Sequence, residues 1–149
     1  MALKKAVILL AEDNPADQEL TRRALMDWSF PNTLHVVDDG AETISYLKRE
    51  GRFSNPDTSP KPDIILMDIN MPRMDGFSAL KEIRNDQSLK TMPIIMLTTS
   101  NQERDVACSY SLGANAFITK PLDFEQFQRV LRVLQEFWLS AATLPPKND

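Results

Sequence analysis

Reactive side chains directly follow four strongly apolar runs in this sequence. Glu12 and Asp13 end one run, Asp68 ends a second, Thr98 a third and Lys120 a fourth. An ionised group that leaves water needs a partner or a metal, and three carboxylates with one ammonium carry a summed charge of about −2 at their reference pKa values. A divalent cation would balance that charge. Because the ligands on offer are oxygens, with no His or Cys nearby in sequence, a hard ion such as Mg²⁺ is indicated.

This set of residue types fits phosphoryl transfer. In that chemistry the metal neutralises charge on the transferring group, while a lysine and a hydroxyl contact its other oxygens, and Lys120 and Thr98 suit those two roles. A carboxylate can itself be the nucleophile and form an aspartyl phosphate, for which Asp68 is the best candidate. Taken singly, each residue has an ordinary explanation as a capping, turn or loop residue. Their conjunction at four strand ends favours the chemical explanation.

Five apolar runs, each followed by a helical pattern, must position these side chains. The runs cover residues 6–11, 34–37, 64–67, 94–97 and 116–119. Their lack of polar alternation is typical of strands covered by helices on both faces, and strands that alternate with helices predict an α/β domain with a parallel sheet. The carboxyl ends of parallel strands gather at one edge, where ligands bind in open α/β sheets. The fold would therefore bring the reactive groups together.

The first and last helices have the clearest sequence signals. Asn14 is a favoured N-cap and Pro15 suits the first helical position. The apolar stripe predicted for this helix has a spacing of four and consists of Ala16, Leu20, Ala24 and Trp28. The last helix is predicted to open at Asp123, and its apolar residues recur at helical spacing: Phe127, Val130, Leu131, Leu134, Phe137 and Trp138. Residues 51–62, with three prolines, are predicted to be an exposed connection.

Length, composition and charge predict one ordinary globular domain. The chain has 149 residues, 42% hydrophobic and 26% charged, which allows a single well-buried core. A formal net charge of −4 gives no electrostatic case for binding nucleic acid. The lone Cys108 excludes an internal disulfide and fits a reducing compartment. The apolar stretch before Glu12 is too short for a signal peptide or a membrane span, so we expect a cytoplasmic protein.

The motifs resemble the receiver domain of two-component response regulators, over residues 3 to 139. The resemblance rests on the Glu12-Asp13 pair, the segment 66–76 around Asp68, and Thr98, Phe117 and Lys120-Pro121. It implies a (βα)5, flavodoxin-like three-layer sandwich whose parallel sheet has the strand order 2-1-3-4-5. It also implies phosphotransfer from a phosphohistidine of a sensor histidine kinase to Asp68. By the same resemblance Mg²⁺, for which Mn²⁺ can substitute, would be held by Glu12, Asp13, Asp68 and the backbone carbonyl of Asn70.

The same resemblance implies a two-state switch in a signalling protein. Lys120 would bridge to Asp68 and then to the phosphoryl group, and the Lys120-Pro121 bond would be cis. Thr98 would swing towards the phosphoryl group while Phe117 moves inward behind it. The only catalysis expected is the protein's own phosphorylation and slow autodephosphorylation. We expect one receiver domain over residues 3–140 and a disordered tail over 141–149.

Five segments are similar to the stand-alone regulators partnered with cyanobacterial phytochrome kinases. They are residues 12–17, 51–53, 97–100, 109–115 and 137–139. This similarity implies a bacterial phytochrome as the kinase, and a homodimer through the fourth and fifth strands and the last helix, with Phe137 and Trp138 in the contact. The alternative is that these C-terminal hydrophobic residues simply cover the sheet.

Three other functions compete with this interpretation. A flavodoxin-like cofactor module should have a hydroxyl- and glycine-rich loop after the first strand, where this chain has Glu12-Asp13. A phosphohydrolase with an aspartate nucleophile usually has a second acid two residues later, where this chain has Asn70. A receiver-like scaffold or dimerisation module that is not phosphorylated remains as the alternative, and the presence of all five site residues argues against it.

Overall fold

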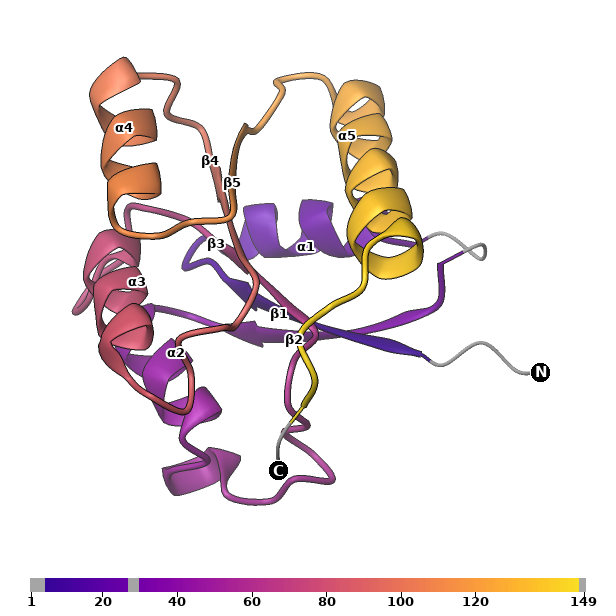
Figure 1. Cartoon of the computed structure of the whole chain (residues 1–149). Helices are drawn as coiled ribbons and strands as arrows, with labels where there is room; N and C mark the ends of the chain where they lie inside the picture. The colour runs from indigo at the N-terminus through magenta and orange to yellow at the C-terminus, as the bar shows by residue number, and fades with distance from the viewer. Residues whose placement is uncertain (1–4, 27–29, 148–149) are drawn as a thin grey trace.

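A five-stranded parallel sheet forms the centre of the molecule, for which we obtained a computed structural model. The structure describes residues 5–26 and 30–147. The strand order is β2-β1-β3-β4-β5 (Figure 1), which confirms the fold and the order that the sequence resemblance implied. The strands are β1 (Ala6–Ala11), β2 (Asn32–Val37), β3 (Ile64–Met67), β4 (Ile94–Thr98) and β5 (Ala116–Thr119).

Within the described residues, five α-helices cover the two faces of the sheet. They are α1 (Pro15–Ala24), α2 (Gly40–Leu47), α3 (Gly76–Asn85), α4 (Glu103–Ser111) and α5 (Phe124–Glu136), with a 3₁₀ turn at Gly51–Phe53 and a π turn at Phe137–Ala141. Helices α1 and α5 lie on one face of the sheet and α2 and α3 on the other (Figure 1). The core has two hydrophobic clusters: apolar residues of α1 and α5 belong to one, and those of α2 and α3 belong to the other. The result is a three-layer sandwich.

The three central strands β1, β3 and β4 are buried on both faces, which explains their uninterrupted apolar runs. In β1, Leu9 and Ala11 face the cluster with α2 and α3, whereas Ile8 and Leu10 face the cluster with α1 and α5. The same alternation continues through β3 and β4. Burying each such Ile or Leu side chain contributes about 1.5–3 kcal/mol. These strands are therefore the most strongly stabilised part of the fold, and they fix the positions of the residues that follow them.

Helix α1 begins as predicted, but its inward face differs from the predicted stripe. The Asn14 side chain accepts hydrogen bonds from the backbone N–H groups of Ala16 and Asp17, which confirms it as the N-cap. Ala24 is buried, yet Leu20 is 40% exposed and Ala16 is exposed, so the stripe is wrong at those two positions. A spacing of four drifts around a helix of 3.6 residues per turn; the inward face holds Thr21, Ala24 and Leu25 instead. Trp28 lies outside the described residues.

The connection between α2 and β3 is exposed over most of its length, but Phe53 is buried, which the composition did not predict. The Phe53 ring packs against Tyr46 with 5.2 Å between centroids, and the Arg52 guanidinium lies 4.3 Å above the Phe53 ring. The Tyr46 hydroxyl donates a hydrogen bond to the carbonyl of Pro60 at 2.7 Å. These contacts fold the connection back onto α2.

The segment after α5 runs back along the amino-terminal edge of the sheet as far as Lys147. The Lys147 ammonium forms an ion pair with Asp63 at 2.9 Å, and Asp63 also accepts a hydrogen bond from the backbone N–H of Val7 at 2.7 Å. The disorder expected for residues 141–149 stays a prediction. Among the helices of the described ranges, none combines the length and the apolar character that crossing a bilayer requires.

Replacing Gly76 should disturb the turn after β3, because a Cβ atom there would lie 2.1 Å from the carbonyl oxygen of Asp68. Gly76→Ala should lower the free energy of unfolding by about 1–3 kcal/mol, the usual cost of overpacking. Urea denaturation measures this change. Ser78→Ala, at an exposed position of the same helix, is the control and should stay within about 0.5 kcal/mol of the wild type. A Gly76→Ala variant as stable as this control would contradict the close approach.

Candidate functional site

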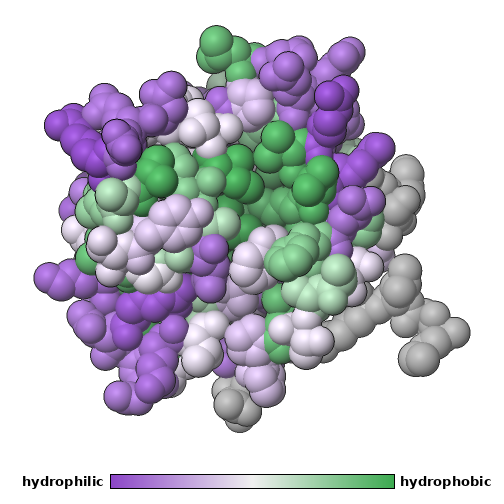
Figure 2. All heavy atoms as spheres, turned by 45° about the horizontal axis from the view of Figure 1, so that its top comes forward, coloured by the Kyte–Doolittle hydropathy of each residue, from purple (hydrophilic) through white to green (hydrophobic). Residues whose placement is uncertain are grey.

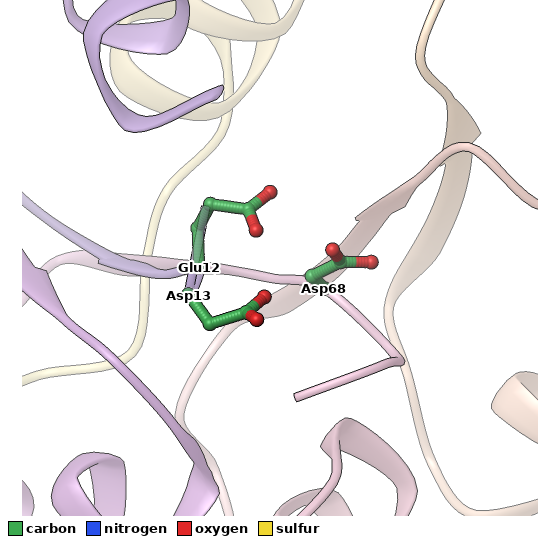
Figure 3. Close-up of side chains that lie close together, drawn as sticks. All are labelled: Glu12, Asp13 and Asp68. Atoms are coloured by element: carbon green, nitrogen blue, oxygen red, sulfur yellow. The ribbon is translucent and has the colours of Figure 1, made fainter. Parts of the chain in front are cut away.

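Three carboxylates meet at the carboxyl edge of the sheet. Ala11 and Met67 are partners in the β1–β3 ladder, so the residues that follow them, Glu12 and Asp68, leave neighbouring strands side by side. One carboxylate oxygen from each of Glu12, Asp13 and Asp68 lies within 4.8 Å of the others (Figure 3). Hard divalent cations favour such oxygen donors. The three carboxylates predicted as ligands therefore lie close together, and this group of oxygens fits a divalent metal.

Glu12 is the most buried member of this cluster, with 1% of its surface exposed. Burial raises the pKa of the Glu12 carboxyl above its usual range, while the ammonium of Lys120 and the backbone N–H of Asn14 act in the opposite direction. The Asn14 N–H donates to Glu12 Oε2 at 3.2 Å, and Lys120 forms an ion pair with Glu12 Oε1. A buried carboxylate with these two donors is kept in place for a further cation.

Lys120 enters the cluster from the end of β5. Its side chain is 9% exposed, and its ammonium lies 3.8 Å from Asp17 and 3.9 Å from Asp68 in addition to its shorter contact with Glu12. The backbone N–H of Lys120 donates to the carbonyl of Thr98 at 2.7 Å, which ties the end of β5 to the end of β4. The ammonium is thus close to Asp68, but its principal partner in this structure is Glu12.

The peptide bond between Lys120 and Pro121 is not cis, contrary to what the family resemblance implied. No peptide bond among the described residues is cis. The trans form of an X–Pro bond is favoured by about 0.5–1 kcal/mol before any tertiary contact acts. In this structure Lys120 reaches the carboxylates with the trans bond, so the geometry of the cluster does not depend on the cis isomer.

Asp68 is held through its backbone and one carboxylate oxygen. Its N–H donates to the carbonyl of Ala11 at 3.0 Å, and its Oδ1 accepts a hydrogen bond from the N–H of Ile69 at 2.7 Å. Its Oδ2 is the atom 3.9 Å from the Lys120 ammonium. Asp68 is half-buried. A fixed carboxylate with one oxygen facing a cation can act as a metal ligand or as a nucleophile.

The remaining predicted residues surround the cluster. Thr98 is fully buried at the end of β4, and its hydroxyl accepts a hydrogen bond from Ser100 N–H at 3.4 Å. Phe117, in β5, is partly buried against the hydrophobic core cluster that includes residues of α2 and α3. Its N–H donates to the Tyr110 hydroxyl at 3.2 Å. Asn70 is exposed two residues after Asp68. The switching roles of Thr98 and Phe117 and the metal contact of Asn70 stay predictions.

Gln18 is a supporting residue that the sequence did not reveal. Its side-chain amide donates to the backbone carbonyl of Glu12 at 2.6 Å and to the carboxylate of Asp38 at 3.0 Å. It therefore links α1 to the ends of β1 and β2. The contact with Asp38 joins residues 20 positions apart, and neither Gln18 nor Asp38 belongs to a motif, so no local signal could have identified it.

Comparison with known proteins points to one family. A family model described as the response regulator receiver domain matches residues 8–132. The response regulator Rcp1 of Synechocystis sp. is 37% identical over 139 residues, which cover 93% of this chain and 92% of Rcp1. The sequence similarity thus includes the acidic cluster and Lys120.

Solved structures show the same similarity. The crystal structure of the phosphorylated cyanobacterial phytochrome response regulator RcpA superposes with a TM-score of 0.88 at 40% identity, covering 96% of this chain and all of that one. The Mn²⁺-bound form of the response regulator Rcp1 superposes with a TM-score of 0.84 at 35% identity, covering 95% of this chain and 99% of that one. The metal in that relative is consistent with the carboxylate cluster found here.

Neutralising one carboxylate of the cluster should weaken divalent metal binding. We expect Asp13→Asn to raise the dissociation constant for Mn²⁺ roughly tenfold or more, because it removes a charged ligand. Isothermal titration calorimetry measures the constant. Asp57→Asn, which removes the same charge from an exposed site in the connection before β3, is the matched control and should bind like the wild type. Equal affinities for the two variants would contradict this site.

Metal binding should also weaken as the pH falls. The pKa of Glu12 is raised by burial, so this carboxyl takes up a proton at a higher pH than an ordinary glutamate and then cannot ligate a cation. The same calorimetric titration, repeated from pH 7.5 downward, should show a dissociation constant that rises on approach to the pKa of Glu12. An affinity that stays constant while the pH falls through the pKa of the Glu12 carboxyl would contradict a ligating role for Glu12.

Proposed function

Since the chain belongs to the response regulator receiver domain family, and so is a signalling protein, we propose that Asp68 accepts a phosphoryl group from a phosphohistidine of a sensor histidine kinase. The observation that carries the proposal is the convergence of the three carboxylates, with the Lys120 ammonium 3.9 Å from Asp68. The proposed domain spans residues 3–140. The proposal includes a cytoplasmic location, which fits the lone Cys108.

The proposed reaction is an in-line displacement at phosphorus. A carboxylate oxygen of Asp68 forms the new P–O bond while the P–N bond to the kinase imidazole breaks, and the imidazole leaves with the bonding electron pair. Mg²⁺ held by Glu12, Asp13, Asp68 and the Asn70 carbonyl would neutralise charge on the transferring group. Lys120 and the Thr98 hydroxyl contact the remaining phosphoryl oxygens. Water later hydrolyses the acyl phosphate slowly.

The ion pair of Lys120 with Glu12 gives a route by which added charge at Asp68 could trigger a switch. Before phosphorylation Lys120 pairs mainly with Glu12. A metal ion on the Glu12 carboxylate weakens that attraction, and a phosphoryl group adds negative charge at Asp68, so both changes draw the ammonium towards Asp68. Thr98 and Phe117 then move with the ends of β4 and β5 and alter the surface formed by β4, β5 and α5.

The proposed kinase partner is a bacterial phytochrome, because the similar regulator RcpA is a cyanobacterial phytochrome response regulator. The proposed output is a homodimer through β4, β5 and α5. An apolar groove on this face is lined by Ile118, Val130, Val133, Leu134, Phe137 and Trp138. Figure 2 shows hydrophobic side chains gathered near the middle of the face turned forward, with hydrophilic side chains around them. Phe137 is 55% exposed and meets Trp138 edge-on.

Phosphorylation can be tested with a small phosphodonor such as acetyl phosphate and Mg²⁺, followed by intact mass spectrometry. We expect one added phosphoryl group on the wild type and none on Asp68→Asn or in the presence of a chelator, because the nucleophile or the cation is then missing. Asp57→Asn should be phosphorylated normally. A phosphoryl group that survives Asp68→Asn would refute the assignment, and an unmodified wild type would favour a scaffold instead.

Dimerisation can be tested by sedimentation velocity with and without a beryllofluoride mimic of the phosphoryl group. Val133 is 58% exposed in the α5 groove, so Val133→Asp should place a charge in the contact and shift the wild-type dimer to monomer. Leu20→Asp, at a comparably exposed position of α1, should not change the assembly. A wild type that stays monomeric at high concentration in both states would eliminate the dimer.

A further inference from the structure

A buried carboxylate outside the acidic cluster holds the loop that follows Asp68. Asp39 has no exposed surface, and its Oδ2 accepts a hydrogen bond from Arg73 Nε at 2.5 Å. Its Oδ1 accepts one from the backbone N–H of Glu42 at 2.8 Å, which caps α2. The Arg73 side chain is 66% exposed. An arginine from the loop between β3 and α3 thus pairs with a buried anion at the start of α2.

A second contact ties the same loop to the same helix. The backbone N–H of Gly40 donates to the carbonyl of Met74 at 2.8 Å. A Cβ atom at position 40 would lie 2.6 Å from that carbonyl oxygen, so only glycine allows the two backbones to approach this closely. The tip of the loop is therefore held by one side-chain contact and one backbone contact, both from the first residues of α2.

The backbone conformation of Arg73 indicates that these two contacts restrain the loop. Arg73 has φ 64°, in the left-handed region that residues with a Cβ atom rarely adopt. Such a conformation persists only where the surroundings over-determine it. Here the buried ion pair and the Gly40–Met74 hydrogen bond supply that restraint.

The restrained loop contains the proposed metal-ligating carbonyl. At its base, the N–H of Gly76 donates to the carbonyl of Ile69 at 2.8 Å, and at its tip Arg73 is bound to Asp39. Asn70 lies between these two anchors in the chain. A carbonyl oxygen ligates a cation well only if its direction is fixed before binding, because otherwise the ordering of the loop opposes binding.

We propose that the Arg73–Asp39 ion pair is a positioning device for the metal site: by pinning the loop at its tip, it presents the backbone carbonyl of Asn70 to the divalent cation. Arg73 itself does not touch the metal or the phosphoryl group. This inference rests on the proposed function, since it requires that the acidic cluster binds a divalent cation. It extends the metal site to Asp39, which belongs to no motif of the sequence, and to Arg73, to which the motif around Asp68 gave no role.

Charge alone predicts the opposite effect, which makes the inference testable. Removing the Arg73 cation makes the protein more negative, which by electrostatics alone would strengthen the binding of a divalent cation. Loss of a positioning contact instead weakens it, and outer-shell partners of metal ligands typically contribute roughly tenfold or more in affinity. The sign of the change therefore separates the two effects.

The experiment measures the Mn²⁺ dissociation constant of the unphosphorylated protein for a set of variants. Arg73→Ala should bind roughly tenfold more weakly, and Arg73→Lys should recover part of the loss because it keeps the charge without the planar fork. Asp39→Asn keeps an oxygen for the Glu42 N–H and should weaken binding similarly. The double variant should be no worse than either single one, since both remove the same contact.

The matched control is Arg52→Ala. Arg52 pairs with Glu42 at 2.8 Å, so this variant also removes an arginine bound to an acid of α2, but away from the loop, and it should keep wild-type affinity. Hydrogen exchange adds a second readout: the backbone amides of residues 70, 71, 73 and 74 should exchange faster in Arg73→Ala and not in Arg52→Ala. Thermal unfolding ensures that every titration is made on folded protein.

The outcomes separate the inference from the proposed function. If Arg73→Ala binds Mn²⁺ as tightly as the wild type, or more tightly, the positioning role is refuted while the metal site stands. If the wild type binds no Mn²⁺, the proposed function fails first. A weakened Arg73→Ala that Arg73→Lys rescues in part, with unchanged binding in Arg52→Ala, is the expected result.

Discussion

Concentrated negative charge at the carboxyl edge of the sheet is the constraint on which the rest of this structure depends. The ladder between β1 and β3 sets Ala11 beside Met67. The acids that follow them in sequence, Glu12 and Asp68, are therefore held close together. The ammonium of Lys120, almost wholly withdrawn from solvent, offsets only part of the charge. The remainder favours a divalent cation, because withdrawing carboxylates from water is costly without one. Burial of Glu12, with its raised pKa, is a direct sign of that cost.

The loop after β3 is as strongly constrained as the acids themselves. Gly76 lies directly under the carbonyl of Asp68, and the tip of the loop is bound to the start of α2 through Asp39. Neither Gly76 nor the Asp39–Arg73 pair belongs to the cluster of carboxylates. The geometry of the site is thus set by neighbours that would be passed over in a search for reactive groups, and a change at either neighbour acts on the site through the backbone of this loop.

Local sequence patterns predicted the strands, and the residues at the strand ends predicted the functional site. Uninterrupted apolar runs identified the strands because both faces of the sheet are covered, and the parallel arrangement then implied that Glu12, Asp13, Asp68 and Lys120 would meet. The strand order came only from the family resemblance. The stripe on α1 was wrong at Leu20 because a spacing of four departs from the helical period, and the cis bond before Pro121 was wrong. Gln18, Asp39 and Arg73 could not be found, since their contacts join distant segments that no local pattern connects.

The position of Lys120 suggests why a small change of charge at this edge can reach a distant surface. Its backbone N–H is bound to the carbonyl of Thr98, so the end of β5 stays tied to β4 while the side chain is free to exchange Glu12 for a phosphorylated Asp68. Phe117 and Ile118 are consecutive in β5 and therefore face opposite sides of the sheet, Phe117 towards the cluster of α2 and α3 and Ile118 towards α5. Ile118 lines the apolar groove of the proposed dimer face. Phe117 and Ile118 share one stretch of backbone, so a displacement of β5 on the side of the charged site would also reach that groove without any intervening element.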